Sequence, residues 1–222
     1  MSLPNSPIVV RAVLFDMDGT LVDSTGVVEQ VWGVFAADYN LDIEAILATS
    51  HGVQGIDTVR RFAPADADHL AIAADLMARE LVATDGIVEI PGALEFVRSL
   101  PNDAVALVTS APVSLAELRM NLAGITMPTV SVTAETVTRG KPDPEGFALA
   151  ARRLGVEPSE TVVFEDAEAG IAGALAAGCR VVVVGGLQSE ITNGLPRIRD
   201  YRGVSATVDV TDVGVRTISI SL

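Results

Sequence analysis

Short, continuous apolar runs rich in valine recur along this chain, and segments with helical periodicity lie between them. The runs occupy residues 8–15, 105–109, 129–132, 161–165 and 180–184. Runs of this length without alternation are typical of strands that are buried on both faces of a parallel sheet. The intervening segments 93–100, 114–123, 144–154 and 168–177 have helical patterns, and glycines follow three of them. The alternation predicts an α/β fold with a doubly wound parallel sheet and right-handed crossovers.

One long stretch after the first run breaks this alternation. Residues 24–88 contain no convincing strand, but helical patterns recur at 27–38, 57–62 and 65–83. A stretch of this length is too long for a loop inside a compact domain. We therefore predict a small helical cap domain over 24–88, inserted into a core formed by 1–23 and 89–222. Segments 21–26 and 84–91 would be its hinges, and residues 205–222 are predicted to form one or two short strands.

The net charge and the cysteine content limit which partners the protein is expected to bind and in which cellular compartment it is expected to work. The formal net charge is −14, which disfavours binding to nucleic acid or to an anionic membrane surface. The single cysteine, Cys179, excludes an internal disulfide and fits a reducing compartment. No apolar run approaches the ~20 residues that cross a bilayer. Residues 1–7 lack the regions of a signal peptide and are predicted to be a disordered leader, so we expect a cytoplasmic monomer.

The first predicted strand ends in FDMDGTL (15–21), which contains two carboxylates. Ligands of open α/β sheets bind at the carboxyl ends of the strands. Asp16 is placed to attack phosphorus and to form an aspartyl phosphate, which divides one difficult displacement into two. Asp18 is placed to protonate the leaving oxygen and then to activate water. Alone, the same residues would also fit an ordinary polar turn.

A second pair of carboxylates, Glu165 and Asp166, follows the apolar run at 161–165. A carboxylate that attacks a phosphate ester is an anion approaching an anion, and Mg²⁺ bound by oxygen ligands would relieve the repulsion. The candidate ligands are Asp16, the backbone carbonyl of Asp18, and Asp166. Glu165 would lie in the first or second shell of the ion. Alone, the pair would also fit an acidic helix N-terminus.

Two further positions are candidates for binding the phosphate. Lys141, in RGKPDP (139–144), is the only lysine in a chain whose other permanently charged cations are arginines. A lysine kept there indicates a need for a compact ammonium, placed to contact both the phosphate and Asp16. Thr109 and Ser110 end the run at 105–109 and would donate hydroxyl and backbone N–H groups to the phosphate.

Together these motifs resemble the haloacid dehalogenase superfamily, and in particular its phosphatases with a helical cap in the first insertion position (a C1-type cap). The segments that carry the resemblance are DMDGTLVDS (16–24), LVTS (107–110), RGKPDP (139–144) and VFEDAEAGI (163–171). The segments SHGVQGID (50–57), FAP (62–64) and EIPG (89–92) look most like glycerol-3-phosphate and 2-deoxyglucose-6-phosphate phosphatases and bacterial sugar-phosphatases. The resemblance implies a Rossmann-like core with an inserted cap.

The resemblance also implies that the cap closes over the site and chooses the substrate. His51, Gln54, Asp57 and Arg60 surround two glycines in the cap and are candidate contacts for substrate hydroxyls. Other interpretations stay open, since Asp57 would also serve as a helix N-cap and His51 as a surface loop residue.

The function that these features favour is Mg²⁺-dependent hydrolysis of a small phosphorylated sugar or polyol through an aspartyl phosphate. A β-phosphoglucomutase-like isomerase is the alternative, although related mutases use a cap lysine that is absent here. A metal-free dehalogenase is disfavoured because Asp18 is present. From another class, a phospho-accepting receiver domain also combines Asp, Thr or Ser, Lys and Mg²⁺. It is disfavoured because it has no inserted cap and carries its nucleophile on a later strand.

Overall fold

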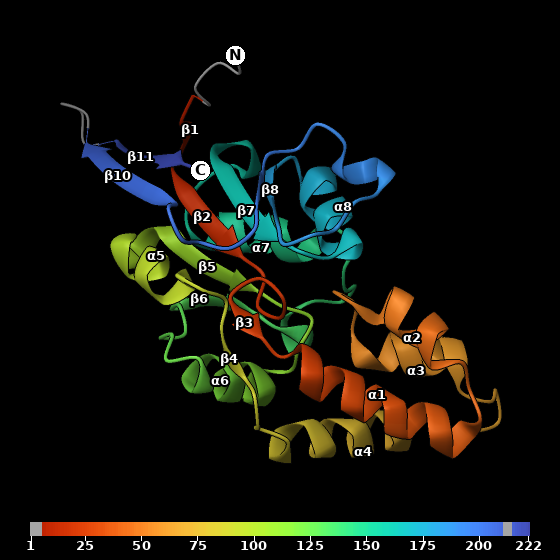
Figure 1. The fold of residues 1–222 in the computed structure, drawn as a ribbon. Coiled ribbons are helices and arrows are strands. Elements are labelled where there is room, and N and C mark those ends of the chain that lie inside the picture. Colours follow the sequence, from red (N-terminus) through yellow and green to blue (C-terminus); the bar gives the residue numbers. More distant parts are fainter. Residues whose placement is uncertain (1–5, 211–214) are drawn as a thin grey trace.

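The core is a six-stranded parallel sheet in the computed structural model, which describes residues 6–210 and 215–222 (Figure 1). Its strand order is β6-β5-β2-β7-β8-β9, and every neighbouring pair is parallel. The strands are β2 (Ala12–Phe15), β5 (Val105–Val108), β6 (Val130–Val132), β7 (Thr161–Glu165), β8 (Arg180–Val184) and β9 (Arg197–Ile198). This arrangement confirms the predicted α/β fold with a parallel sheet.

Helices cover both faces of the sheet, as a doubly wound fold requires. Side chains alternate along each strand, so Val13 and Phe15 join one buried cluster while Leu14 joins the other. The first cluster includes Phe96 and Met120, from α5 (Ala93–Ser99) and α6 (Val113–Leu122). The second is covered by α7 (Glu145–Arg153) and α8 (Glu168–Ala177). Each strand of the sheet centre is therefore buried on both faces.

The predicted single strand over residues 8–15 is wrong. The chain forms β1 (Ile8–Val10) and β2, which belong to different sheets and are separated by Arg11. The Arg11 backbone N–H donates to the Glu160 carbonyl at 2.7 Å, and its side chain pairs with the Glu160 carboxylate at 3.2 Å. These contacts hold the polar residue at the junction, where the chain leaves one sheet for the other.

The C-terminal segment forms two strands, which confirms its prediction. β10 (Ser205–Val210) and β11 (Arg216–Ser221) pair antiparallel, and β11 also pairs with β1. The resulting three-stranded sheet contributes Ile218 and Ile220 to the cluster beneath β2. Residues 1–5, in the predicted leader, and residues 211–214, between the two strands, lie outside the described residues.

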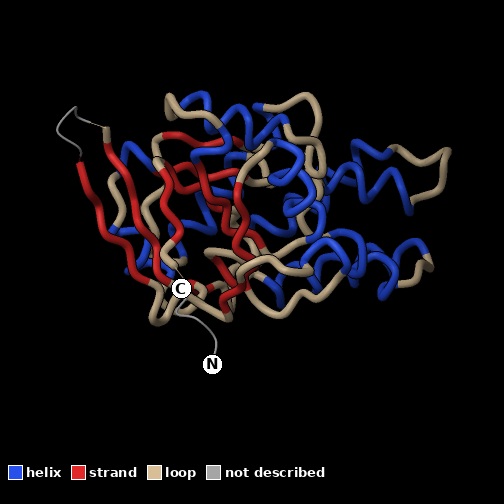
Figure 2. The backbone as a smooth tube through the Cα atoms, turned by 90° about the horizontal axis from the view of Figure 1, so that it is seen from above, coloured by secondary structure: helices blue, strands red, loops and turns tan. Residues whose placement is uncertain are grey.

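Four helices form the cap, which extends to one side of the core (Figure 2). They share a buried cluster of their own that includes Trp32, Phe35 and Ile46. Two short strands lead into and out of the cap and pair antiparallel, with Val22 opposite Glu89. Among the described helices, none combines the length and the apolar character that crossing a bilayer requires. These elements are α1 (Thr25–Tyr39), α2 (Ile43–Ser50), α3 (Gly55–Phe62), α4 (His69–Val82), β3 (Val22–Asp23) and β4 (Val88–Glu89).

Candidate active site

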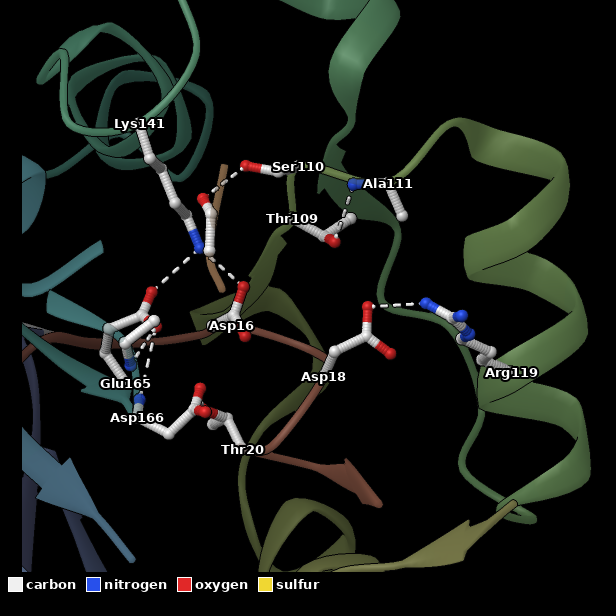
Figure 3. Close-up of polar contacts among 12 residues, drawn as sticks. Asp16, Asp18, Thr20, Thr109, Ser110, Ala111, Arg119, Lys141, Glu165 and Asp166 are labelled. Atoms are coloured by element: carbon white, nitrogen blue, oxygen red, sulfur yellow. Dashed lines mark hydrogen bonds and ion pairs between the residues drawn. The ribbon is translucent and has the colours of Figure 1, made fainter. Parts of the chain in front are cut away.

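The polar residues that follow β2, β5 and β7 lie together at one edge of the sheet (Figure 3). Strand β2 is hydrogen-bonded to β5 on one side and to β7 on the other. Asp16, Thr109 and Asp166 each follow their strand directly, and Glu165 is the last residue of β7. Neighbouring parallel strands thus bring together residues that are about 150 positions apart in the sequence.

Lys141 connects the loop before α7 to this edge. Its Nζ donates to Asp16 Oδ1 at 2.5 Å and to Glu165 Oε2 at 2.8 Å, and its side chain is 5% exposed. Burial alone would lower the pKa of Lys141, but Asp16 and Glu165 outweigh it and raise that pKa. The ammonium is therefore charged and fixed beside the residue that the sequence predicts to be the nucleophile.

Three carboxylates lie close together here, and the ammonium of Lys141 pairs with two of them, Asp16 and Glu165. Oxygens of Asp16, Glu165 and Asp166 lie within 4.8 Å of one another. Burial and the neighbouring Glu165 raise the pKa of Asp16 to about 7, and burial with Glu165 and Asp16 raises the pKa of Asp166 well above its usual range. The three carboxylates therefore outnumber the positive charge beside them, which is that of Lys141. Its donors are all hard oxygens, which fits a divalent cation such as Mg²⁺.

Glu165 is held by contacts to both of its oxygens. Oε1 accepts hydrogen bonds from the backbone N–H groups of Asp166 at 3.2 Å and Ala167 at 3.1 Å, while Oε2 accepts from Lys141. A Cβ at Gly170 would lie 1.9 Å from Oε2, so α8 reaches the carboxylate only because position 170 has no side chain. Gly19 has the same relation to Asp166, at 2.1 Å. Sequence reasoning did not single out either glycine.

Asp18 is engaged on the other side of the cluster. Its Oδ1 accepts from the Ser24 hydroxyl at 2.6 Å, and its Oδ2 accepts from Arg119 at 2.9 Å. Arg119 also pairs with Glu80 of the cap at 2.9 Å. The sequence analysis missed both members of this second pair. The sequence does contain one signal for Arg119: at helical spacing it falls on the same face as the apolar Leu115, Ala116 and Met120. All four residues are buried in the structure, and an arginine on a buried face requires partners for its charge.

The hydroxyls of Thr109 and Ser110 have different partners. Thr109 Oγ1 accepts from the backbone N–H of Ala111 at 3.1 Å, which leaves its own proton free to donate. Ser110 Oγ donates to the carbonyl of Gly52, in the cap, at 2.7 Å. The Ser110 hydroxyl thus connects core to cap in this structure, whereas the Thr109 hydroxyl is available to a ligand.

A cavity of about 330 Å³ separates this edge of the core from the cap. His51 and Gln54 line it, and Gln54 Nε2 contacts the carbonyl of Ala134 in the core at 3.5 Å. Asp57 and Arg60 are not among its lining residues. They pair with each other at 3.2 Å on the exposed surface of α3. The N-cap of α3 is Gln54 rather than Asp57, which lies in the first turn, so the N-cap interpretation of Asp57 is wrong.

Comparisons with known proteins agree with the family that the sequence motifs resemble. The model of the haloacid dehalogenase-like hydrolase family matches residues 10–178. Hexitol phosphatase A of Escherichia coli is 43% identical over 178 residues, which cover 78% of this chain and 82% of that protein. Glycerol-1-phosphate phosphohydrolase 2 of Saccharomyces cerevisiae is 34% identical over 186 residues, covering 78% and 74%.

Among solved structures, β-phosphoglucomutase from Clostridium difficile superposes with a TM-score of 0.76. The match covers 87% of this chain and 92% of that chain at 20% identity, and it shows a shared fold. The family model spans most of the chain, in agreement with the motifs from which the resemblance was inferred. The chain belongs to the haloacid dehalogenase-like hydrolase family.

Proposed function

We propose that this hydrolase is a Mg²⁺-dependent phosphatase that acts on phosphate monoesters of small sugars or polyols through an aspartyl phosphate. The relatives named above, which are phosphatases of hexitol and glycerol phosphates, support the reaction class and the type of substrate. The observation that carries the mechanism is the buried cluster of Asp16, Glu165 and Asp166 around Lys141. The family assignment sets the receiver domain aside as an alternative.

In the first step an oxygen of Asp16 attacks the phosphorus atom of the substrate. A bond forms between this oxygen and phosphorus, and the bond from phosphorus to the ester oxygen breaks. Asp18, in its protonated form, gives its proton to the departing oxygen, so the alcohol leaves as a neutral molecule. To do so, Asp18 must exchange one of its contacts to Ser24 and Arg119 for the ester oxygen.

In the second step water releases the phosphate. Asp18, now a carboxylate, takes a proton from a water molecule whose oxygen attacks phosphorus, and the bond to Asp16 breaks. Inorganic phosphate leaves, and Asp16 and Asp18 return to their starting forms. One residue thus serves as acid and then as base, which fits its place on the same β2 loop as the nucleophile.

The surrounding residues hold the phosphoryl group. Asp16, Asp166 and the backbone carbonyl of Asp18 are the proposed ligands of Mg²⁺, which when bound supplies positive charge against the phosphoryl oxygens. Lys141 supplies a further charge next to Asp16, and the Thr109 hydroxyl donates to a phosphoryl oxygen. The contacts of Glu165 favour an outer role, in which it orients Lys141.

The test is release of inorganic phosphate from a panel of hexitol, hexose and glycerol phosphates, with Mg²⁺ and after chelation by EDTA. We expect release that EDTA abolishes and Mg²⁺ restores. Acid quenching during turnover, followed by mass spectrometry, should place a phosphoryl group on the peptide that contains Asp16. Full activity after exhaustive chelation would contradict the proposed mechanism. Conversion of a sugar phosphate to its isomer without phosphate release would favour the mutase alternative instead.

A further inference from the structure

Beyond the phosphate-binding edge, the cavity is mostly apolar toward the cap. Helices α1 and α4 of the cap and α6 of the core form this wall. A polyol or sugar exposes C–H groups as well as hydroxyls, so an apolar wall of this kind accommodates its carbon chain. The large apolar residues of the wall are Val28, Trp32, Leu76, Met77 and Leu115.

The charges that line the cavity are mostly negative. Its lining residues, all of them described, include four carboxylates and a single permanently charged cation, Arg119. Lys141 lies at the neighbouring phosphate end, where Asp16 and Glu165 hold it. A second anionic group on a substrate would therefore find only Arg119 to bind it. The four carboxylates are those of Asp16, Asp18, Glu80 and Asp166.

Arg119 is already committed to two carboxylates. Its side chain is 3% exposed, and its two terminal nitrogens contact Asp18 and Glu80, each at 2.9 Å. Asp18 belongs to the β2 loop and Glu80 to α4, so the guanidinium bridges core and cap. To bind an anion of the substrate, it would have to give up or share one of these two partly exposed ion pairs, which weakens its attraction for that anion.

Glu80 lines the cavity on the far side of Arg119 from Asp18. The contacts run from Asp18, which is proposed to protonate the ester oxygen, through Arg119 to Glu80. The Glu80 side chain is 15% exposed and lines the cavity. A carboxylate there accepts hydrogen bonds from hydroxyls and repels a second anion, because Coulomb repulsion is strong where water is excluded.

We propose that the Glu80–Arg119 ion pair is the specificity determinant that admits neutral, hydroxyl-bearing phosphate monoesters and rejects substrates with a second anionic group. This inference rests on the proposed function and deepens it. Glu80 supplies both the attractive and the repulsive element, since the group that accepts hydroxyls also excludes bisphosphates and phosphorylated sugar acids. Glu80 also neutralises the charge of Arg119. Without Glu80, the freed guanidinium would bind a carboxylate or phosphate of the substrate strongly.

The experiment compares two substrates that differ at one carbon. Glucitol 6-phosphate carries a hydroxymethyl group where 6-phosphogluconate carries a carboxylate, and both have six carbons. We expect the wild-type kcat/KM for glucitol 6-phosphate to be at least about a hundredfold higher. In Glu80→Gln, which keeps the shape and removes the charge, this ratio should fall by about tenfold or more. The change should come mainly from a lower KM for 6-phosphogluconate. Glu29→Gln, on the exposed face of α1 and away from the cavity, is the matched control and should keep the wild-type ratio.

Two results would overturn the proposal. One is a wild-type enzyme that hydrolyses both compounds with similar kcat/KM. The other is a folded, active Glu80→Gln enzyme whose ratio equals that of the wild type. If Glu80→Gln does not fold, Glu80→Asp decides, because it keeps the charge and must keep the rejection of 6-phosphogluconate. Failure of the proposed function looks different: the wild type would release no phosphate from either compound or from p-nitrophenyl phosphate.

Discussion

The phosphate end and the cap end of the cavity each place one buried cation between two carboxylates. Lys141 lies between Asp16 and Glu165, and all three residues belong to the core. Arg119 lies between Asp18 and Glu80, and Glu80 belongs to the cap. The first arrangement involves no residue of the cap, whereas the second depends on where the cap sits. The comparison fits the proposed division, in which the core performs the chemistry and the contact between core and cap selects the substrate.

Asp16→Asn should have the largest effect, because it breaks the phosphate end at its centre. We expect turnover below about a hundredth of the wild-type value, since covalent catalysis contributes several kcal/mol to transition-state stabilisation. Asparagine keeps the shape, and Lys141 retains Glu165, so the fold should persist. Phosphate release measures the first expectation, and near-ultraviolet circular dichroism measures the second. Residual activity above a hundredth would contradict the assignment of Asp16 as nucleophile.

Lys141→Arg should cost about an order of magnitude or more in kcat/KM. It keeps the charge, but a planar fork replaces a compact ammonium in a buried position between two carboxylates. Arg139→Lys, two residues away and exposed, is the reverse exchange and should change activity by about twofold at most. A Lys141→Arg enzyme with wild-type activity would show that the phosphate end needs only a positive charge and not a compact ammonium.

Gly170→Ala should cost about tenfold in activity although it replaces no charged residue. Its new methyl group would overlap the Glu165 carboxylate, which must then move and release Lys141. Gly33→Ala in α1 is the control, because a Cβ at position 33 meets nothing within 4 Å. That change should be neutral or stabilise the protein by up to about 1 kcal/mol. Melting temperature and phosphate release are measured for both, and unchanged activity in Gly170→Ala would mean that Glu165 does not position the lysine.

The phosphate end could be predicted from the sequence because each of its residues stands at the end of an apolar run or in a short motif, although Lys141 is 125 positions from Asp16. Strands β7 and β8 and helix α8 have the predicted bounds, and Asp16 and Asp166 follow their strands directly. Buried parallel strands read as continuous apolar runs, and catalytic residues stand where the runs stop. The lone lysine could be linked to Asp16 because no other residue of the chain offers that chemistry.

The cap end could not be predicted in the same way, because no strand end or motif marks Arg119 and Glu80, whose charges meet only in the folded chain. Arg119 is 101 positions from Asp18 and 39 from Glu80, and each sits on a helix where charged residues usually face water. The break at Arg11 has the same cause, since β1 pairs with β11 near the other end of the chain. Asp57 and Arg60 show the converse: they are polar residues near two glycines and so are candidates for substrate contact, yet they pair with each other on the surface and do not line the cavity.

The smallest effects are expected for the hydroxyls of Thr109 and Ser110, which lie between the phosphate end and the cap end. Thr109→Val keeps the shape and removes the hydroxyl that is free to bind phosphate, so we expect about a tenfold loss in kcat/KM. Ser110→Ala removes only the hydrogen bond to Gly52 of the cap, and a neutral hydrogen bond of about 1 kcal/mol predicts about a fivefold loss or less. The Ser110→Ala loss should fall mainly on KM, because in the proposed mechanism the cap holds the substrate while the core performs the chemistry. Measuring kcat and KM for both variants decides the matter. If Ser110→Ala instead lost as much kcat as Thr109→Val, its hydroxyl would have to leave Gly52 and bind the phosphate during turnover, and the boundary between the two ends would lie closer to the cap.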